Sequence, residues 1–589
     1  MTFERSNRSI SGLFLGSILS IVGLAAAGAA PASAQAQDGE PPSFSEVVDV
    51  QLVNVEVWVS DRRGRPVTGL GPDDFEVRED GEPVTIDFFS EVTDAVSARP
   101  VGEAGEPAAE PEATGAGAAA EPAHLVLYFD ELHLGPASRK RAIEDLRAFL
   151  DEEKFPAERV LIFRQDRDLV TEAYFGSSRE DLDAALERIA ASPGMGGQSQ
   201  QAKRLAIRRL NQLWQDARTL ASAGSSRRNS APAPCGTFVR QALPEVENAA
   251  HIGRDRIGAT LDHLTTTVRF LAALPGVKTL LYISDSLERT PGSDLRDFIT
   301  GLCPAGDRFR SMSPVAELST GFHELTRHAN ANRVTVYSLQ TSGLRSTFLS
   351  AAEQSSIDFQ GANPFNSSVR EAERDGMAVL ADETGGRAIF NRNQFGDELE
   401  QIAGEMASYY SLAYRPPHGG DRGEHQIRVR VRGRNVQVRH RRGYRDKSSD
   451  QRMSEQLDGA LYLGLVENPL GVRLGAGRVR AAAGGKRRLP LHVMVPAAQV
   501  AFLPFEDKEM ARIRVEVASR HAQTSKVVRD EKTFLVEAPP DRDTRLLDLV
   551  FNIDIPDGLN LVAVGVRDDA TRETAFVSTT LAVGEGARN

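Results

Sequence analysis

Two continuous apolar runs, each closed by an aspartate, constrain the fold of this chain more than any other feature. Residues 124–130 read HLVLYFD and residues 279–285 read TLLYISD, without the alternation expected of a half-exposed strand. Such runs are typical of central strands in a parallel sheet that is covered on both faces. Segments with helical periodicity separate these runs from two further strand-like segments, 158–165 and 333–339. This alternation predicts a doubly wound α/β domain, whose ligands bind beyond the carboxyl ends of the strands.

Changes in composition along the 589 residues mark several further units. We expect a signal peptide at 1–34, an N-terminal β unit at 44–93, a disordered linker rich in Ala, Gly, Glu and Pro at 94–123, the α/β domain at 124–416 with insertions near 192–250 and 344–368, a β hairpin at 417–446, and a C-terminal, β-sandwich-like domain at 454–587. The linker indicates that the N-terminal unit moves separately, although that unit could instead pack on the hairpin after Tyr410.

The N-terminal segment predicts export. Arg5 and Arg8 precede an apolar run at 12–30, and small residues up to Ala34 suit cleavage by signal peptidase. A membrane anchor is the alternative, because the run approaches the roughly 20 residues that span a bilayer. We expect cleavage after Ala34, a secreted or periplasmic protein, and no transmembrane segment in the mature chain.

An oxidising compartment would allow the two cysteines, Cys235 and Cys303, to form a disulfide. Both fall in predicted loops, and two free thiols are the alternative, since sequence does not show whether their Cα atoms approach each other. The formal net charge of -12 argues against a nucleic-acid-binding protein, which needs a basic face. No nucleophile elbow, P-loop or dinucleotide-binding motif is present, and His323 and His328 are one residue too far apart for a helical zinc motif.

Several segments, taken in order, resemble the bacterial exported proteins called VWFA-related, which contain a von Willebrand factor type A domain. They are the β unit at 48–89, Asp130 at the end of its strand, LPGVKTLLYISDSL at 274–287, LADETGGRAIFNRN at 380–393 and SYYSLAYRPP at 408–417. The resemblance covers about residues 45–445. It implies a von Willebrand type A fold and a binding site at the strand ends.

Members of this family with a working metal site present Asp-x-Ser-x-Ser after the first strand, a Thr from a second loop and an Asp after a later strand. Here Asp130 is followed by Glu131-Leu132-His133-Leu134, so both serine positions hold leucine. Asp285 matches the last aspartate, and Ser199 could replace the threonine with a one-residue shift. The resemblance therefore implies a degenerate site, with Asp130, Asp285 and Ser199 as ligands of a weakly bound Mg²⁺, Mn²⁺ or Ca²⁺, or with no metal. Alternatively, both aspartates cap helix N-termini or loop amides.

These observations lead to two functional hypotheses. The first is a non-enzymatic, adhesion-type protein that binds a protein partner in the cell envelope or outside the cell through its strand-end face. That face would contain Asp130, Glu131, His133, Asp285 and Ser286. The second is a metal-assisted hydrolase of the cell envelope that uses Asp130 and Asp285.

Overall fold

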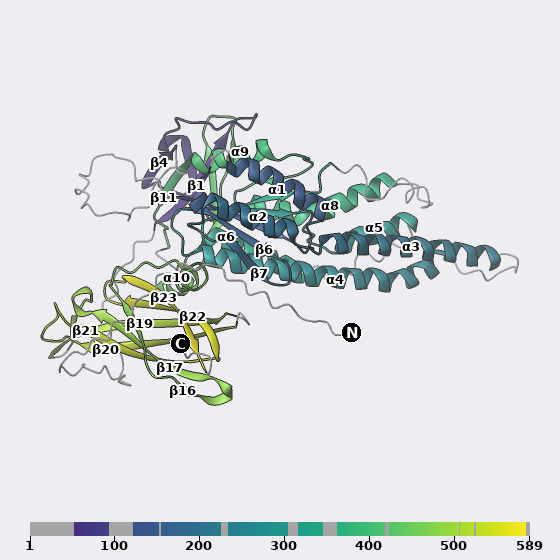
Figure 1. Cartoon of the computed structure of the whole chain (residues 1–589). Coiled ribbons are helices and arrows are strands. Elements are labelled where there is room, and N and C mark those ends of the chain that lie inside the picture. The colour runs from purple at the N-terminus through teal and green to yellow at the C-terminus, as the bar shows by residue number, and fades with distance from the viewer. Residues whose placement is uncertain are drawn as a thin grey trace.

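The computed structural model describes residues 52–93, 122–151, 155–224, 234–303, 316–344, 362–418, 423–505, 507–522 and 526–584. These ranges form an N-terminal β sandwich, a central α/β domain and a C-terminal β domain (Figure 1). The predicted signal peptide and nearly all of the predicted linker lie outside the described residues, as does most of the predicted insertion near 344–368. Within the described ranges, no helix combines the length and apolarity needed to cross a membrane.

The α/β domain contains a six-stranded sheet in the order β10-β9-β8-β5-β6-β7. Its strands are β5 (Ala123–Asp130), β6 (Val160–Gln165), β7 (Leu169–Ala173), β8 (Val277–Ser284), β9 (Val334–Gln340) and β10 (Ala388–Ile389). All neighbours are parallel except β6 and β7. The predicted α/β domain with a mainly parallel sheet is thereby confirmed.

Helices cover both faces of this sheet. Helices α1 (Pro136–Asp151), α2 (Arg179–Ala191) and α9 (Gly396–Ala407) contribute to one core, and α4 (Pro234–Leu271), α6 (Ala316–Ala331) and α8 (Ala362–Glu383) contribute to the other. Along β5, Leu127 and Phe129 belong to the first core, whereas Val126 and Tyr128 belong to the second. Burial on both faces explains why the strand reads as a continuous apolar run.

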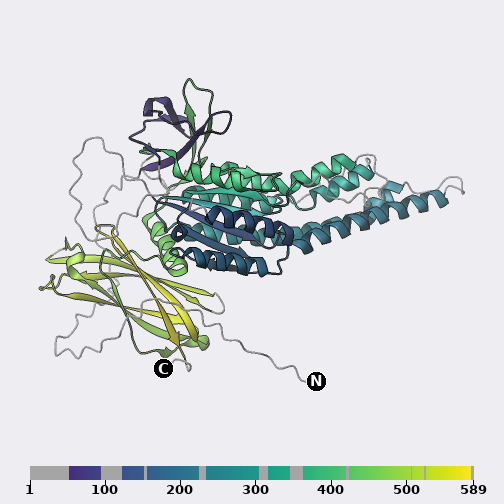
Figure 2. The same cartoon turned by 45° about the horizontal axis from the view of Figure 1, so that its top comes forward.

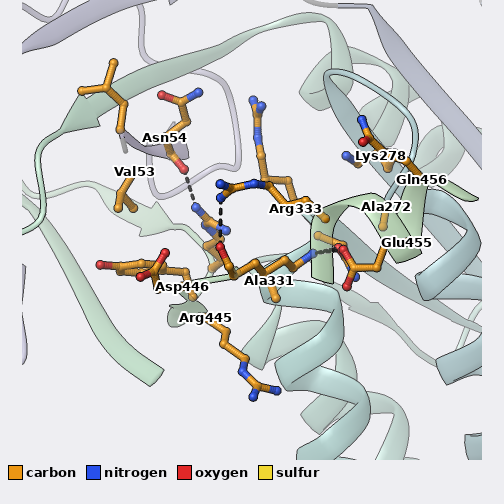
Figure 3. A pocket seen from close by; sticks show the side chains of 16 residues that line it. Val53, Asn54, Ala272, Lys278, Ala331, Arg333, Arg445, Asp446, Glu455 and Gln456 are labelled. Atoms are coloured by element: carbon orange, nitrogen blue, oxygen red, sulfur yellow. Dashed lines mark hydrogen bonds and ion pairs between the residues drawn. The ribbon is translucent and has the colours of Figure 1, made fainter. Parts of the chain in front are cut away.

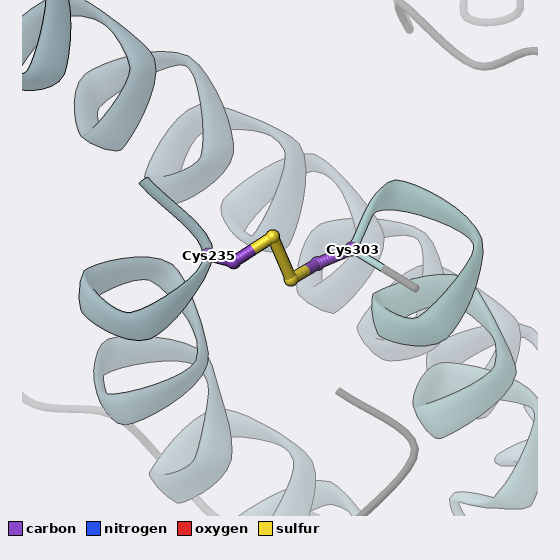
Figure 4. Close-up of a disulfide and its surroundings, with 2 residues drawn as sticks. All are labelled: Cys235 and Cys303. Carbon is purple, nitrogen blue, oxygen red and sulfur yellow. A yellow bond between two sulfur atoms is a disulfide. The ribbon is translucent and has the colours of Figure 1, made fainter. Parts of the chain in front are cut away.

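Long helices project from one end of the α/β domain and form what we call the helical arm: α3 (Gly196–Gly224), the first half of α4, and α5 (Ser293–Leu302) (Figures 1 and 2). Within the described residues, the predicted insertion near 192–250 therefore consists mainly of these long helices. Apolar residues at helical spacing, Ile207 and Leu210 on α3 with Phe238 and Ala242 on α4, give the arm its own small core. Cys235, in the first turn of α4, forms a disulfide with Cys303, which directly follows α5 (Figure 4). Both cysteines thus lie at helix ends rather than in loops.

The N-terminal strands and the strands after the α/β domain form one sandwich of two four-stranded sheets, β13-β1-β11-β4 and β14-β12-β2-β3. The strands are β1 (Val53–Ser60), β2 (Phe75–Glu79), β3 (Glu82–Val84), β4 (Phe88–Val92), β11 (Tyr409–Tyr414), β12 (Glu424–Val431), β13 (Gln437–Arg439) and β14 (Gly443–Arg445). The N-terminal unit therefore packs on the segment after Tyr410, the second of the two alternatives above. Strand β11 belongs to this sandwich, so the α/β domain ends with α9 and not near residue 416.

The predicted hairpin at 417–446 needs a correction. The chain does turn at Gly433, where φ is +67°, but β12 pairs with β2 and β14, whereas β13 pairs with β1 in the other sheet. Both strands keep their apolar side chains in the shared core because the chain crosses from one sheet to the other at this turn.

The C-terminal domain begins with a helix, not a strand. Helix α10 (Ser449–Leu463) starts at a capping box between Ser448 and Gln451, and its apolar face packs on three strands of the domain. Two sheets follow, built from β15 (Arg473–Ala476), β16 (Arg480–Ala481), β17 (Arg487–Pro496) and β21 (Leu546–Ile555), and from β18 (Leu503–Phe505), β19 (Lys508–His521), β20 (Val527–Glu537), β22 (Gly558–Asp568) and β23 (Thr574–Val583). Apolar residues from both sheets form one core between them, which makes this part a β sandwich.

Candidate functional site

Asp130 ends strand β5 and Asp285 follows the adjacent strand β8, so both lie at the carboxyl edge of the α/β sheet. Strands β5 and β8 are parallel neighbours, with Phe129 opposite Ile283. The Asp130 carboxylate is completely buried. Its Oδ1 accepts a hydrogen bond from the Leu132 backbone N–H at 3.1 Å, and its Oδ2 accepts from the hydroxyl of Tyr282 and lies 3.3 Å from Ser284 Oγ.

His133 supplies the charge that balances Asp130. The loop after β5 turns back, so that His133 Nδ1 lies 2.7 Å from Asp130 Oδ2. Burial disfavours the imidazolium, but the Asp130 carboxylate and, more weakly, Glu288 outweigh burial and raise the pKa of His133 above its ordinary value. Asp130 and His133 therefore form a buried ion pair when His133 is protonated.

Asp285 is also interior, with 2% of its surface exposed. Its Oδ2 accepts hydrogen bonds from the Gly135 N–H at 3.0 Å and from Gln200 Nε2 at 3.1 Å, and its Oδ1 accepts from Thr341 Oγ1 at 3.0 Å. These donors come from three different segments. Asp285 thus joins the loop after β5, the first turn of α3 and the end of β9.

Glu131 is completely buried and forms an ion pair with Arg139 on α1. Burial raises the pKa of Glu131 to about 7, although the Arg139 guanidinium acts in the opposite direction. Its Oε1 has no hydrogen-bond partner. A carboxyl group with these surroundings exchanges its proton near neutral pH.

The two predicted serines lie at the margin of this network. Ser199 donates a hydrogen bond to the Leu132 carbonyl at 3.3 Å and accepts one from Arg256. Ser286 is half-buried, and its carbonyl accepts a hydrogen bond from Ser284 Oγ at 3.0 Å. Neither contact directs a serine hydroxyl at a carboxylate.

The base of the helical arm covers this edge of the sheet. The N–H groups of Met195 and Gly196 donate to the Glu131 carbonyl at 2.8 and 3.0 Å. A Cβ at Gly196 would overlap the backbone of Leu134, so only glycine lets α3 start this close to the strand ends. Farther along α3, Lys203 Nζ lies 2.6 Å from carboxylate oxygens of both Glu288 and Asp294. A partner that approaches the strand ends therefore meets the arm first.

Sequence reasoning identified the two aspartates but missed most of their partners, above all Gln200 and Thr341. Thr341 could have been found, because it follows strand β9 as Asp285 follows β8, and parallel strands end at one edge. Gln200 gave no comparable signal. Its position depends on how the arm folds back onto the domain.

A second cluster, which the sequence did not predict, lies in the N-terminal sandwich. Glu79, His418 and His425 present ligand atoms within 4.8 Å of one another, and they are the candidate metal ligands among the residues that the structure describes. His418 Nε2 is 2.8 Å from Glu79 Oε1, and His425 Nδ1 is 3.6 Å from the same atom. The Tyr444 hydroxyl donates to Glu79 at 3.1 Å. Two imidazoles and a carboxylate are ligands typical of Zn²⁺.

The geometry of the two rings limits this assignment. His418 and His425 are stacked, with centroids 3.8 Å apart and planes inclined by 9°. An ion lies close to the plane of each imidazole that binds it, so one ring must turn before both can ligate a single ion. The cluster is a candidate zinc site that needs a local rearrangement.

We expect Zn²⁺ to raise the melting temperature of the wild-type protein more than that of the variant His418→Ala. A ligand that binds only the folded state stabilises it by RT ln(1 + [L]/Kd), which is about 2.7 kcal/mol at a hundredfold excess over Kd. Differential scanning calorimetry with and without Zn²⁺ measures the effect. His492→Ala is the matched control, because His492 pairs with Asp548 in the C-terminal domain. An equal response of all three proteins would rule out zinc binding by this cluster.

No protein-family model matches this chain, and a search of curated proteins found no similar sequence. The resemblance to VWFA-related proteins therefore stays a hypothesis, supported by the order of the sequence segments.

Proposed function

We propose that this chain is an exported, non-enzymatic interaction protein that binds a protein partner through its helical arm. The observation that carries the proposal is the position of the arm, whose base rests on the carboxyl edge where ligands of α/β sheets bind. Because Asp130, Glu131 and Asp285 are interior, this edge offers a partner the surface of the arm rather than these carboxylates. The strand ends act as the anchor of the arm.

The surface of the arm suits a protein partner. Leu205 and Leu220 on α3 are 54% and 60% exposed, and Ile252 on α4 is 43% exposed. Helix α3 also carries five basic side chains and one acidic side chain, in a chain whose net charge is -12. Exposed leucines among arginines favour a partner with an acidic, partly apolar surface, in the cell envelope or outside the cell.

The arm is also held in one conformation. The disulfide Cys235–Cys303 joins two of its helices (Figure 4), and the Lys203 ion pairs fix α3 to the segment before α5 and to α5 itself. A preorganised surface loses less conformational entropy on binding than a flexible one. Rigidity therefore supports a role in recognition.

The alternative, a metal-assisted hydrolase, finds less support in the contacts. A cation between Asp130 and Asp285 would have to displace the hydrogen bonds from Gly135, Gln200 and Thr341, and it would compete with His133 for Asp130. Each displaced donor would then stay buried without a partner, which costs about 1–3 kcal/mol.

Capture of a partner by the full-length protein tests the proposal. We expect the variant Leu205→Asp/Leu220→Asp to retain less than about a tenth of the wild-type affinity, because it places two charges within the contact, and a tenfold loss corresponds to about 1.4 kcal/mol. The experiment is a pull-down from envelope extracts with partner identification by mass spectrometry, followed by titration of the purified partner. High salt should weaken the complex, since exposed charges contribute to it.

Two matched variants separate the possible outcomes. Leu546→Asp/Leu559→Asp introduces the same charges at exposed leucines of the C-terminal domain and should leave binding unchanged. If the arm variant binds as the wild type does while Asp285→Asn does not, the partner contacts the strand ends and the proposed role of the arm is wrong.

A further inference from the structure

The three domains meet around a cavity of about 340 Å³ (Figure 3). Its walls come from β1 of the N-terminal sandwich, from the turn between α6 and β9 in the α/β domain, from the segment after β13, and from α10. Cavities at domain junctions are common sites for small ligands. The chemistry of the lining decides what this one could hold.

Positive charge dominates the cavity. Its lining contains six basic side chains, namely Lys278, Arg333, Arg441, Arg445, Lys447 and Arg452. The lining contains two acidic residues, Asp446 and Glu455. Glu56, just outside, pairs with Arg333, and Glu455 pairs with Lys447 at 2.5 Å. The basic side chains still outnumber these acids, so the cavity has a positive potential.

Two buried donors at this cavity have no partner. Arg441 is 8% exposed, and both its terminal nitrogens donate to backbone carbonyls, of Asn330 and Asn54, while its Nε has no hydrogen-bond partner. Asn332 is 4% exposed; its Oδ1 accepts from Lys447 Nζ, and its Nδ2 has no partner. Because an ammonium group must face the amide oxygen, this contact fixes the orientation of the Asn332 amide. Both unsatisfied groups are therefore donors.

The charges in the cavity wall are incompletely compensated. Burial lowers the pKa of Lys447, and the neighbouring Arg441 and Arg452 lower it further, although Glu455 opposes them. Burial likewise lowers the pKa of Arg441, even though Glu56 lies close enough to raise it. An added negative charge would stabilise both cations, whereas a neutral ligand would not.

We propose that this interdomain cavity binds a small organic anion, and that Arg441, Asn332 and Lys447 hold its carboxylate or phosphate oxygens. Oxyanions accept several hydrogen bonds, so such a group supplies acceptors of the kind that these unpartnered donors lack, and it offsets the excess positive charge. The volume suits a ligand of small-metabolite size. Such a ligand would contact all three domains and fix their relative positions. This site is separate from the helical arm and does not depend on the proposed partner.

Calorimetric titration of the full-length protein tests the site with two probes, citrate and inorganic phosphate, against sodium chloride at equal ionic strength. We expect at least one probe to bind and to raise the melting temperature above that in chloride. Binding of citrate alone would identify a carboxylate ligand, and binding of phosphate alone would identify a phosphate-bearing one. Absence of binding by both probes would overturn the proposal.

A substitution in the wall makes the test specific. Asn332→Asp replaces an unsatisfied donor by a carboxylate of the same size and should raise the Kd of the bound probe at least tenfold. Asn552→Asp makes the same change at an exposed position of β21 and should leave the Kd unchanged. If Asn332→Asp impairs folding, Arg452→Gln provides a second test. This variant should raise the Kd of the bound probe by a smaller but still measurable factor. Equal affinity of the wild type and a folded wall variant would show that the anion binds elsewhere.

Discussion

Replacing Arg139 by methionine is expected to lower the free energy of unfolding by about 3–5 kcal/mol at pH 8, because a buried charge then loses its partner. Glu131 is completely buried and Arg139 is 4% exposed, so water replaces little of the lost interaction. Urea denaturation followed by tryptophan fluorescence in a Trp58→Phe background, where Trp214 in α3 is the remaining tryptophan, measures the change in the part of the chain anchored at this pair. Methionine keeps most of the volume of the arginine stem and isolates the loss of charge.

The same pair predicts how stability depends on pH. The pKa of Glu131 is raised to about 7 in the folded protein, from an ordinary value of 4.5, so the folded state binds this proton more tightly than the unfolded state. The stabilising contribution is therefore complete below about pH 4.5 and is lost as the pH rises through about 7, by about 3 kcal/mol in total. In Arg139→Met the folded-state pKa rises further, so the variant should lose less stability at pH 5 than at pH 8.

Two variants serve as controls for this prediction. Glu131→Gln/Arg139→Met removes both charges and should recover most of the stability that Arg139→Met loses. Arg188→Met breaks an ion pair with Glu172 in which the arginine is 53% exposed, and it should cost less than about 1 kcal/mol. A loss in Arg139→Met that is equal at pH 5 and pH 8 would show that ionisation of Glu131 is not its cause.

The sequence predicted the α/β domain and the two strand-end aspartates because both depend on local patterns. A strand buried on two faces must be apolar throughout, and parallel strands must end at one edge, so Asp130 and Asp285 were expected to lie side by side. What these carboxylates contact depends on segments remote in sequence. Gln200 is 85 residues from Asp285, and Thr341 is 56 residues from it.

The N-terminal sandwich shows where local patterns fail. Alternation identifies which face of a strand is buried, but it does not identify the neighbouring strand. Val53 pairs with Tyr414, and Val431 pairs with Phe75, over some 350 residues of intervening chain. The metal-ligand cluster was missed for the same reason, because Glu79 and His425 meet only through the pairing of β2 with β12.

The helical arm was missed for a different reason. Its helices begin and end in segments rich in Gly, Ser and Gln, and its exposed faces carry many arginines, so polar composition concealed an apolar stripe of helical period. The small core of the arm uses few residues. We therefore expect its disulfide to contribute a large share of its stability, as in other small units.

The variant Cys235→Ala/Cys303→Ala is expected to lower the free energy of unfolding by about 4 kcal/mol, the chain-entropy value for unfolding the whole loop that the disulfide closes. The cysteines are 68 residues apart, and the loop between them contains nearly all of α4, all of β8 and all of α5. Alanine avoids placing a hydroxyl at Cys303, which is completely buried. Urea denaturation and the rate of limited proteolysis within α3 and α4 measure the loss, and the wild type treated with dithiothreitol should behave as the variant does.

Loss of the disulfide should make the arm sensitive to protease while the α/β domain keeps its native fold. The loop that the disulfide closes also contains β8, a central strand of the six-stranded sheet, so the main thermal transition of the α/β domain should fall as well, while the increase in protease sensitivity should be confined to the arm. Partner capture should fall together with protection of the arm from protease, because a disordered arm must first be ordered on binding. If the variant resists protease as the wild type does, the packing of α3 on α4, and not the disulfide, keeps the arm folded. If protection is lost while capture persists, the partner does not bind the arm, and its binding surface must be sought elsewhere on the chain.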